Sequence, residues 1–394
     1  MDSCAGLRSM AVLETLSGKA GHRVEPGEII EVDADIALSH ENADLVIEKF
    51  RETGRDLAIP EKIFIVLDHR VPAESESTAN LHARIRRFVG EHSIRNFYDV
   101  GNGICHEVLA ESGLLCYGKL VIGTDSHTPT AGYCGAVGIG VGATDMAYVW
   151  ATGKIYLTVP EVTGIALHGA AKASTYPMDI GLALLDRLKQ GYEYTAFELC
   201  GEYVAREGTS ARKTICNLLV ETGAKTICVD AGNAENVQVD VDVSEIEPVI
   251  AMPGNPADVK RCADVQGIAV DQVFVGTCTS GRLEDIAVLA SVLKGKHVHR
   301  NVRMLVAPAS RRILQMATSS GYIQTLLDAG CVILPPGCGP CLGAHMGLLG
   351  DGEACLSAGN RNYQGRMGSK DAKIYLASPY TCACSALEGH ICVK

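Results

Sequence analysis

The chain has 394 residues, of which 47% are hydrophobic, 21% charged and 5% aromatic, and it carries 16 cysteines and a formal net charge of −11. This composition excludes a disordered chain, the length predicts two or three domains of about 150 residues each, and the acidic balance argues against a nucleic-acid partner. No run approaches the roughly 18 apolar residues of a membrane span and the start Met1-Asp2-Ser3-Cys4 has no signal-peptide pattern, so we expect a cytoplasmic protein with reduced thiols and no membrane partner.

Apolar runs rich in Ile, Val and Leu recur along the chain, and several end directly before a residue capable of chemistry. The runs lie at residues 62–67, 119–122, 273–275, 303–306, 331–334 and 374–377. Continuous apolar runs of this length are typical of strands that are buried on both faces in a parallel sheet. Segments with helical spacing lie between them, at residues 282–293 and 311–327.

The alternation of strands and helices predicts the α/β fold class. We expect three α/β/α units, at residues 1–159, 160–245 and 246–394, with a proline-containing linker at 246–259. Ligands of such folds bind at the carboxyl ends of the strands. Because the reactive residues of this chain follow predicted strands, we expect the functional site at those ends.

Three cysteines lie in turns rich in Gly and Pro, where thiolates could meet around one centre. Cys278 lies in Gly276-Thr-Cys-Thr-Ser-Gly281, and Cys338 and Cys341 lie in Gly337-Cys-Gly-Pro-Cys-Leu-Gly343. Four interpretations are open on these residues alone. They are a dithiol catalyst built on Cys338 and Cys341, a zinc site completed by His345, an iron–sulfur cluster held by three thiolates with one iron left open, and buried thiols in tight turns.

Carboxylate and imidazole side chains stand together where two of the predicted strands end. A carboxylate can orient an imidazole and stabilise its charged form, which suits general acid–base catalysis. The candidates for such pairs and their neighbours are Asp68, His69, His106, Asp125, Ser126, His127 and Glu221.

Two glycine-containing segments have the composition of binding loops. Arg361 and Arg366 lie five residues apart in Asn360-Arg361-Asn362-Tyr363-Gln364-Gly365-Arg366, and together they could clamp a substrate with several carboxylates, because arginine binds carboxylate in a bidentate geometry. The run Gly138-Ile-Gly-Val-Gly142 lacks the preceding strand and the following acidic residue of a dinucleotide site. We therefore interpret it as close packing of a helix against a sheet.

Together these motifs resemble the large subunit of the aconitase family, in its two-subunit isopropylmalate dehydratase branch. The resemblance extends from Pro26-Gly-Glu-Ile-Ile-Glu-Val-Asp33 to Ser378-Pro-Tyr-Thr-Cys-Ala-Cys-Ser385. It is most specific in Gly123-Thr-Asp-Ser-His-Thr-Pro-Thr130, in the Cys338 and Cys341 motif, and in Gly359-Asn-Arg-Asn-Tyr-Gln-Gly-Arg366. The chain departs from the family at Ser280, where Asn is usual, and in His40-Glu41-Asn42-Ala43-Asp44, where the usual Asp-Gly-Thr or Asp-Ala-Thr is absent.

The resemblance implies three α/β/α units packed around a 4Fe-4S cluster, with one open iron and the ligands Cys278, Cys338 and Cys341. It implies reversible dehydration of a hydroxy-dicarboxylate or tricarboxylate, with rehydration at the neighbouring carbon. By motif, Asp68 and His69 would protonate the departing hydroxyl. His106 with Asp125, and His127 with Glu221, would orient the reacting oxygen and polarise the site. The implied substrate-binding residues are Ser126, Asn217, Asn360, Arg361 and Arg366.

The resemblance also implies a partner. Single-chain members carry a swivelling domain that contributes a serine and a further arginine, and this chain ends at Lys394 without room for it. We therefore expect a small subunit that supplies the catalytic base and part of the specificity pocket. The expected activity is 3-isopropylmalate dehydratase, in leucine biosynthesis. The alternatives are homoaconitase, citramalate dehydratase and 2,3-dimethylmalate dehydratase and, from another class, an iron-regulated RNA-binding protein.

Overall fold

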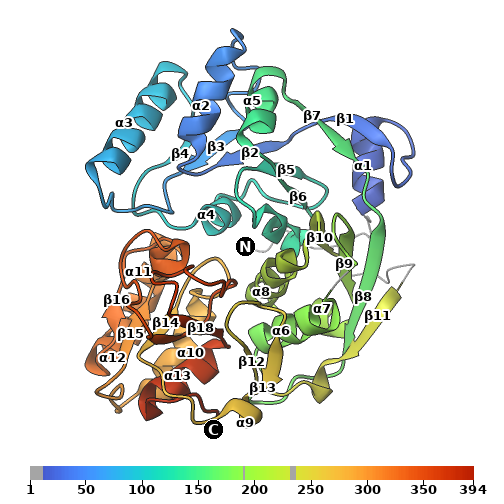
Figure 1. The fold of residues 1–394 in the computed structure, drawn as a ribbon. Coiled ribbons are helices and arrows are strands. Elements are labelled where there is room, and N and C mark those ends of the chain that lie inside the picture. The colour runs from blue at the N-terminus through green and yellow to red at the C-terminus, as the bar shows by residue number, and fades with distance from the viewer. Residues whose placement is uncertain (1–11, 190, 231–236) are drawn as a thin grey trace.

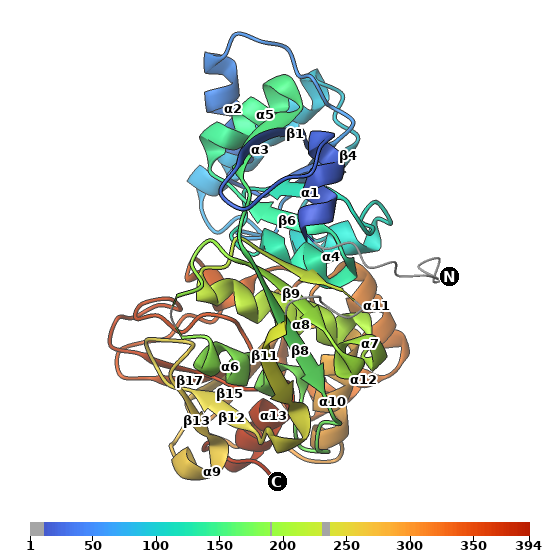
Figure 2. The same cartoon turned by 90° about the vertical axis from the view of Figure 1, so that its right-hand side faces the viewer.

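The computed structural model describes residues 12–189, 191–230 and 237–394, so that Met1 to Cys4 lie outside the described residues. Three groups of strands and helices surround the centre of the molecule (Figure 1). Figure 2 shows the first group, coloured blue to green, above the other two. Each group contains a largely or wholly parallel sheet, which confirms the predicted α/β class.

The first sheet has the order β4-β3-β2-β5-β6 and is parallel throughout. Its strands are β2 (Ile36–Ser39), β3 (Ile63–Val66), β4 (Asn96–Tyr98), β5 (Leu120–Gly123) and β6 (Val137–Gly140). The accompanying helices are α1 (Val12–Ala20), α2 (Ala43–Glu52), α3 (Glu76–Glu91), α4 (Cys105–Glu111), the 3-10 helix η1 (Thr128–Cys134) and α5 (Ala143–Thr152). An antiparallel ribbon pairs β1 (Ile29–Asp33) with β7 (Lys154–Thr158). Strands β2, β3 and β5 are buried along their whole length, as in a sheet covered on both faces.

The second sheet has the parallel order β10-β9-β8-β11. Its strands are β8 (Val162–His168), β9 (Ala196–Cys200), β10 (Thr226–Val229) and β11 (Val237–Asp242). Its helices are α6 (Pro177–Arg187), α7 (Glu202–Arg206), α8 (Thr209–Leu219) and the 3-10 helices η2 (Val220–Thr222) and η3 (Val243–Glu245).

The third sheet has the order β13-β12-β18-β17-β14-β15-β16, and β12 runs antiparallel to both of its neighbours. Its strands are β12 (Val249–Ala251), β13 (Val259–Arg261), β14 (Gln272–Val275), β15 (Arg303–Val306), β16 (Val332–Ile333), β17 (Ala354–Ser357) and β18 (Lys373–Leu376). Its helices are α9 (Cys262–Val265), α10 (Leu283–Leu293), α11 (Arg311–Ser319), α12 (Tyr322–Asp328), the 3-10 helix η4 (Gly339–Leu342) and α13 (Pro379–Glu388). We keep the unit boundaries after residues 159 and 245 as a proposal, which is supported because each of these sheets takes its strands from one of the three ranges.

Two local expectations meet a different outcome, and the close packing expected at Gly138 is confirmed. The segment 311–327 is two helices, because Gly321 adopts φ +76° between α11 and α12 and interrupts the helical backbone. The segment 246–259 is not a simple linker, since it contains the buried strand β12. Gly138 does pack closely, but it lies within β6: a Cβ there would come within 2.3 Å of the carbonyl oxygen of Thr128, in η1.

The carboxyl ends of the parallel strands position the reactive residues. Asp68 follows β3, Asp125 follows β5, Cys278 follows β14 and Asn360 follows β17. None of the described helices is long and apolar enough to cross a membrane.

Candidate active site

One cavity collects side chains from distant parts of the sequence. It encloses about 400 Å³, including the part that is open to solvent. The predicted site residues that line it are His69, His106, Asp125, Ser126, His127, Cys278, Cys338, Cys341, Asn360, Arg361 and Arg366. The other predicted residues, Asp68, Asn217 and Glu221, lie behind the lining and hydrogen bond to it.

The thiols are fixed by amides from two different units. Asn217, in α8, donates from Nδ2 to the Cys278 Sγ at 3.1 Å, and Asn360 donates to the same sulfur at 3.4 Å. Asn360 also donates to the Asn217 Oδ1 at 3.0 Å, which links the two amides. Burial raises the pKa of the Cys278 thiol, and it raises that of Cys338 to about 12. The thiolate forms therefore need a cation beside them.

The Cys338 loop is attached to the end of β3. The Cys338 N–H donates to the carbonyl oxygen of Asp68 at 3.0 Å. Gly337 permits this approach, because a Cβ at that position would lie 2.9 Å from the same oxygen. One loop contact thus joins a predicted metal ligand to the predicted acid–base pair.

Two carboxylates organise the imidazoles. The Asp68 Oδ1 lies 2.6 Å from His69 Nδ1, and its other oxygen accepts the N–H of Cys105 at 2.6 Å. Asp125 lies between two rings, with Oδ1 2.7 Å from His106 Nε2 and Oδ2 3.3 Å from His69 Nε2. Burial alone would raise the pKa of Asp125, but His106 and His69 hold it well below its usual range. Burial would likewise lower the pKa of His69, but the neighbouring Asp68, Cys338 and Asp125 raise it well above its usual range.

Glu221 joins an imidazole and a guanidinium from the other two units. Its Oε1 lies 2.8 Å from both His127 Nε2 and Arg361 Nε, and its Oε2 accepts the Tyr363 hydroxyl at 3.3 Å. Although burial opposes it, these partners lower the pKa of Glu221. Arg366 differs from Arg361, because its buried Nε has no hydrogen-bond partner in the described part of the chain.

Two residues that contact this site, Glu41 and Tyr363, were not predicted from the sequence. Glu41, 4% exposed, accepts the backbone N–H groups of His69 and Arg70. Its position two residues after the short apolar run of β2 was the available signal. Tyr363 lies in the loop between Arg361 and Arg366, and no separate role was predicted for it.

The single-ion and dithiol interpretations find little support in this geometry. The ligand atoms of a single metal ion lie close to one another. Among the described residues, one group has its possible ligand atoms within 4.8 Å of one another, and it consists of His40, Glu41, Asp68 and His69. His345 is not grouped with the cysteines, and its Nε2 lies 3.3 Å from the carbonyl oxygen of His69. A dithiol catalyst needs a lowered thiol pKa, whereas burial raises that of Cys338.

Comparison with known families agrees with the motifs. A model of the Aconitase family (aconitate hydratase) matches residues 16–238 and 230–389. The chain belongs to the aconitase family. Membership of this family implies an iron–sulfur cluster.

Curated relatives of the aconitase family match nearly the whole chain. A probable 3-isopropylmalate dehydratase large subunit of Methanothermobacter thermautotrophicus is 42% identical, over 97% of this chain and 98% of that protein. A probable methanogen homoaconitase large subunit of Methanosarcina mazei is 44% identical, over 91% of this chain and 98% of that protein. Among solved structures, aconitase X of Thermococcus kodakaraensis aligns with a TM-score of 0.53 over 91% of this chain and 90% of that chain, at 14% identity. That likeness concerns the fold alone.

Proposed function

We propose that this chain is the large subunit of 3-isopropylmalate dehydratase, a hydro-lyase that moves the hydroxyl group between neighbouring carbons of isopropylmalate in leucine biosynthesis. The observation that carries the proposal is one cavity in which three thiols, paired imidazoles and carboxylates, and two arginines converge. Relatives named as large subunits of this enzyme, about 40% identical over 95–97% of the chain, support it.

We further propose that Cys278, Cys338 and Cys341 hold a 4Fe-4S cluster with one iron that has no protein ligand. When bound, the cluster supplies a Lewis acid for the hydroxyl that leaves. The donor set fits such a group. The three sulfurs line one cavity but are not crowded as ligands of a single ion are, since a cluster spreads its thiolates over separate irons. Buried amide N–H groups already point at Cys278, where they would stabilise a thiolate.

The proton for the departing hydroxyl comes from His69. Its Nδ1 is held by Asp68 at 2.6 Å, and its Nε2 lies 3.3 Å from Oδ2 of Asp125, another residue that lines the cavity. Hydroxide is a poor leaving group, and a proton donor at this position lowers the barrier to its departure. His106 and Asp125, which are joined by a 2.7 Å contact, line the same cavity next to His69.

Arginines bind the substrate carboxylates in different ways. Arg366 has a buried Nε without a partner among the described residues, whereas Glu221 fixes Arg361 in one orientation. Ser126 and Asn360 add polar groups to the lining. A substrate with two carboxylates is thereby oriented before the proton transfer, which favours catalysis by positioning.

The carbon-bound proton is removed by a base on a small-subunit partner, which also completes the specificity pocket. Relatives whose names contain "large subunit" support a two-subunit assembly. The cysteines in the described part of the chain form no disulfides, which fits a reducing compartment such as the cytoplasm. The proposed substrate is a small hydroxy acid, and we propose no nucleic-acid or membrane partner.

Homoaconitase is the second candidate, because a relative that is 44% identical carries that name. A substrate panel separates the two activities. The large chain is reconstituted anaerobically with iron and sulfide, combined with the small subunit of its own organism, and assayed with 3-isopropylmalate, homocitrate, citramalate and 2,3-dimethylmalate. The highest kcat/KM with isopropylmalate supports the proposal, and a clear preference for homocitrate replaces it with the second candidate.

A matched pair of cysteine variants tests the cluster. Cys341→Ser should lose the broad visible absorption and part of the iron, because one ligand is missing. Cys262→Ser makes the same substitution at a buried cysteine outside the cavity, in α9, and should retain both the visible absorption and the iron. A wild-type spectrum for Cys341→Ser would remove this residue from the ligand set.

A further inference from the structure

Glu41 lies directly behind His69, the proposed proton donor. We propose that Glu41 is a positioning residue, which fixes the backbone at His69 and so aims the imidazole into the cavity. This inference rests on the role given to His69 above. It assigns a task to a segment, 40–44, that departs from the usual sequence of the family.

The parallel sheet brings Glu41 to this place. Strands β2 and β3 are neighbours in register, with Ser39 opposite Ile65, so the segments that follow them run side by side. Glu41 Oε1 accepts the N–H of His69 at 2.9 Å and that of Arg70 at 2.8 Å, and Oε2 lies 3.0 Å from the same His69 nitrogen. One buried carboxylate therefore satisfies two consecutive backbone donors beyond the end of β3.

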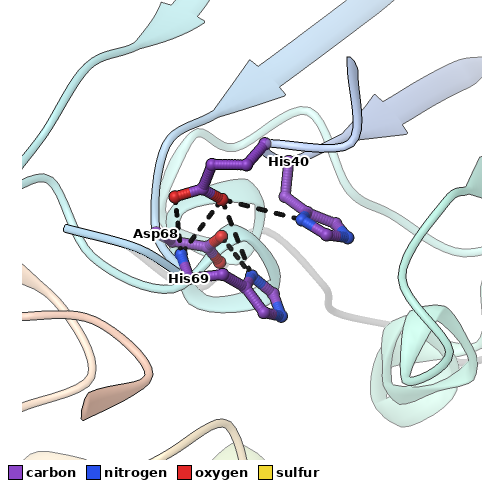
Figure 3. A group of neighbouring side chains, drawn as sticks. His40, Asp68 and His69 are labelled. Carbon is purple, nitrogen blue, oxygen red and sulfur yellow. Dashed lines mark hydrogen bonds and ion pairs between the residues drawn. The ribbon is translucent and has the colours of Figure 1, made fainter. Parts of the chain in front are cut away.

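The ring of His69 is held separately from its backbone. Asp68 bonds its Nδ1, and the His40 ring stacks on its face, with centroids 4.1 Å apart and an interplanar angle of 25°. Figure 3 shows the two rings against each other, with Asp68 beside His69. Glu41 adds the backbone contact that these two side chains do not provide. His69 is thus fixed at its main chain, its edge and its face.

The same residues satisfy a distance criterion for a metal site, but their bonds favour positioning. Both oxygens of Glu41 face the backbone N–H of His69. Both oxygens of Asp68 are also engaged, one with His69 Nδ1 and one with the N–H of Cys105. Glu41 Oε2 also lies 3.6 Å from His40 Nδ1 and 3.9 Å from His69 Nδ1, but the shortest contacts of the two carboxylates are to backbone N–H groups and, for Asp68, to His69 Nδ1. A metal ion would have to displace these hydrogen bonds.

Removing the carboxylate would leave two part-buried donors without their acceptor. These are the N–H groups of His69 and Arg70, and an N–H that is shielded from water and has no acceptor lowers stability. The loop would relax toward other acceptors and turn the imidazole away from its contact with Asp125. Loss of a residue that orients a reacting group from behind commonly lowers activity by about 10–100-fold.

Two variants of equal length separate acceptance of hydrogen bonds from negative charge. Glu41→Gln keeps an amide oxygen that can accept both N–H groups, whereas Glu41→Met keeps the length and has no acceptor. In the complex reconstituted with iron and small subunit, we expect Glu41→Met to lower kcat by about 10–100-fold, with KM changed less than about threefold and iron content unchanged. Glu41→Gln should stay within about fivefold of wild-type kcat.

The control is Glu198→Met. Glu198 is 5% exposed, and its carboxylate accepts the N–H of Val12 at 2.7 Å, away from the cavity. Glu198→Met removes a carboxylate that accepts a backbone N–H, as Glu41→Met does, and this variant should keep the wild-type kcat. If Glu198→Met lowers kcat as much as Glu41→Met does, the effect is general destabilisation and the proposal fails.

A double variant tests whether Glu41 acts through His69. If it does, Glu41→Met should add no more than about a twofold loss in the His69→Ala background, because the group that it positions is already gone. If Glu41→Met lowers kcat as much in the His69→Ala background as it does in the wild type, the proposal is overturned. An equal loss of kcat in Glu41→Gln and Glu41→Met would also overturn it, and so would loss of iron in either variant. If Glu41→Met does not fold, the kcat and iron content of Glu41→Gln alone decide the question. Wild-type turnover of His69→Ala itself would instead refute the proposed proton donor.

Discussion

The buried ion pair between Glu107 and Lys213 gives a prediction with a definite magnitude. Lys213 Nζ lies 2.7 Å from Glu107 Oε1, and the two side chains are only 9% and 10% exposed. Glu107 follows His106 in α4, and Lys213 lies one turn before Asn217 in α8, so the pair joins two helices that carry site residues. The ammonium also lies 4.8 Å from the centre of the Tyr133 ring.

Removing one partner leaves the other charge buried without compensation. We expect Glu107→Gln to lower the free energy of unfolding by about 3–5 kcal/mol, because Lys213 keeps its desolvation cost and loses its counter-ion. Replacing both residues, as in Glu107→Leu with Lys213→Met, should cost far less than the single change, since no buried charge remains. The single variant should also lower kcat, because it loosens the helix that carries His106.

The assay is urea unfolding of the cluster-loaded chain, with an exposed pair as the control. Lys189 and Asp186 approach to 2.6 Å, but their side chains are 56% and 41% exposed, so Asp186→Asn should cost at most about 1 kcal/mol. A loss below about 1 kcal/mol in Glu107→Gln would refute the reasoning, as would a double variant that is less stable than the single one.

Three further predictions concern single residues. His69→Ala should lower kcat by about 10²–10⁴-fold and change KM little, because the proton donor acts in the transition state; unchanged turnover in steady-state kinetics would contradict it. Arg366→Lys should raise KM by about tenfold or more, because an ammonium cannot pair with a carboxylate in a bidentate geometry, and an unchanged KM would argue against this contact. Burial raises the pKa of Asp179 from 3.8 to about 7. The folded state then binds this proton more tightly than the unfolded state, so stability should fall by about 2 kcal/mol between pH 5 and pH 7. Urea unfolding should show this loss in the wild type but not in Asp179→Asn, and equal pH dependence of the two would contradict it.

The strands were predictable where burial on both faces leaves a continuous apolar run. The runs at 62–67 and 119–122 correspond to β3 and β5. The break between α11 and α12 was missed because the apolar spacing continues across Gly321, whose backbone conformation is not a matter of hydrophobic pattern. The apolar run of β2 is only four residues long and did not stand out as a strand. No role was therefore predicted for Glu41, which lies just beyond it.

Site contacts between units could not be read from local patterns. Asn217 and Cys278 are 61 residues apart, and no spacing rule connects an amide in α8 to a sulfur after β14. Glu221 and Arg361 are 140 residues apart, and their pairing depends on how the second and third sheets pack. The resemblance to the family predicted these residues as a set, and the packing of the three units brings them into contact.

Two carboxylates at the cavity, Asp125 and Glu221, are poor bases, and this supports a partner that supplies one. The pKa of Asp125 is held well below its usual range and that of Glu221 is lowered, in each case against burial and by cationic partners. A carboxylate that is stabilised as an anion takes up a proton reluctantly, so neither group suits removal of a carbon-bound proton. We therefore expect the cluster-loaded large chain to exchange no carbon-bound hydrogen of 3-isopropylmalate with deuterium oxide, as followed by NMR, and addition of the small subunit to start the exchange. Exchange by the large chain alone would place the base on this chain and would contradict the division of labour between the subunits.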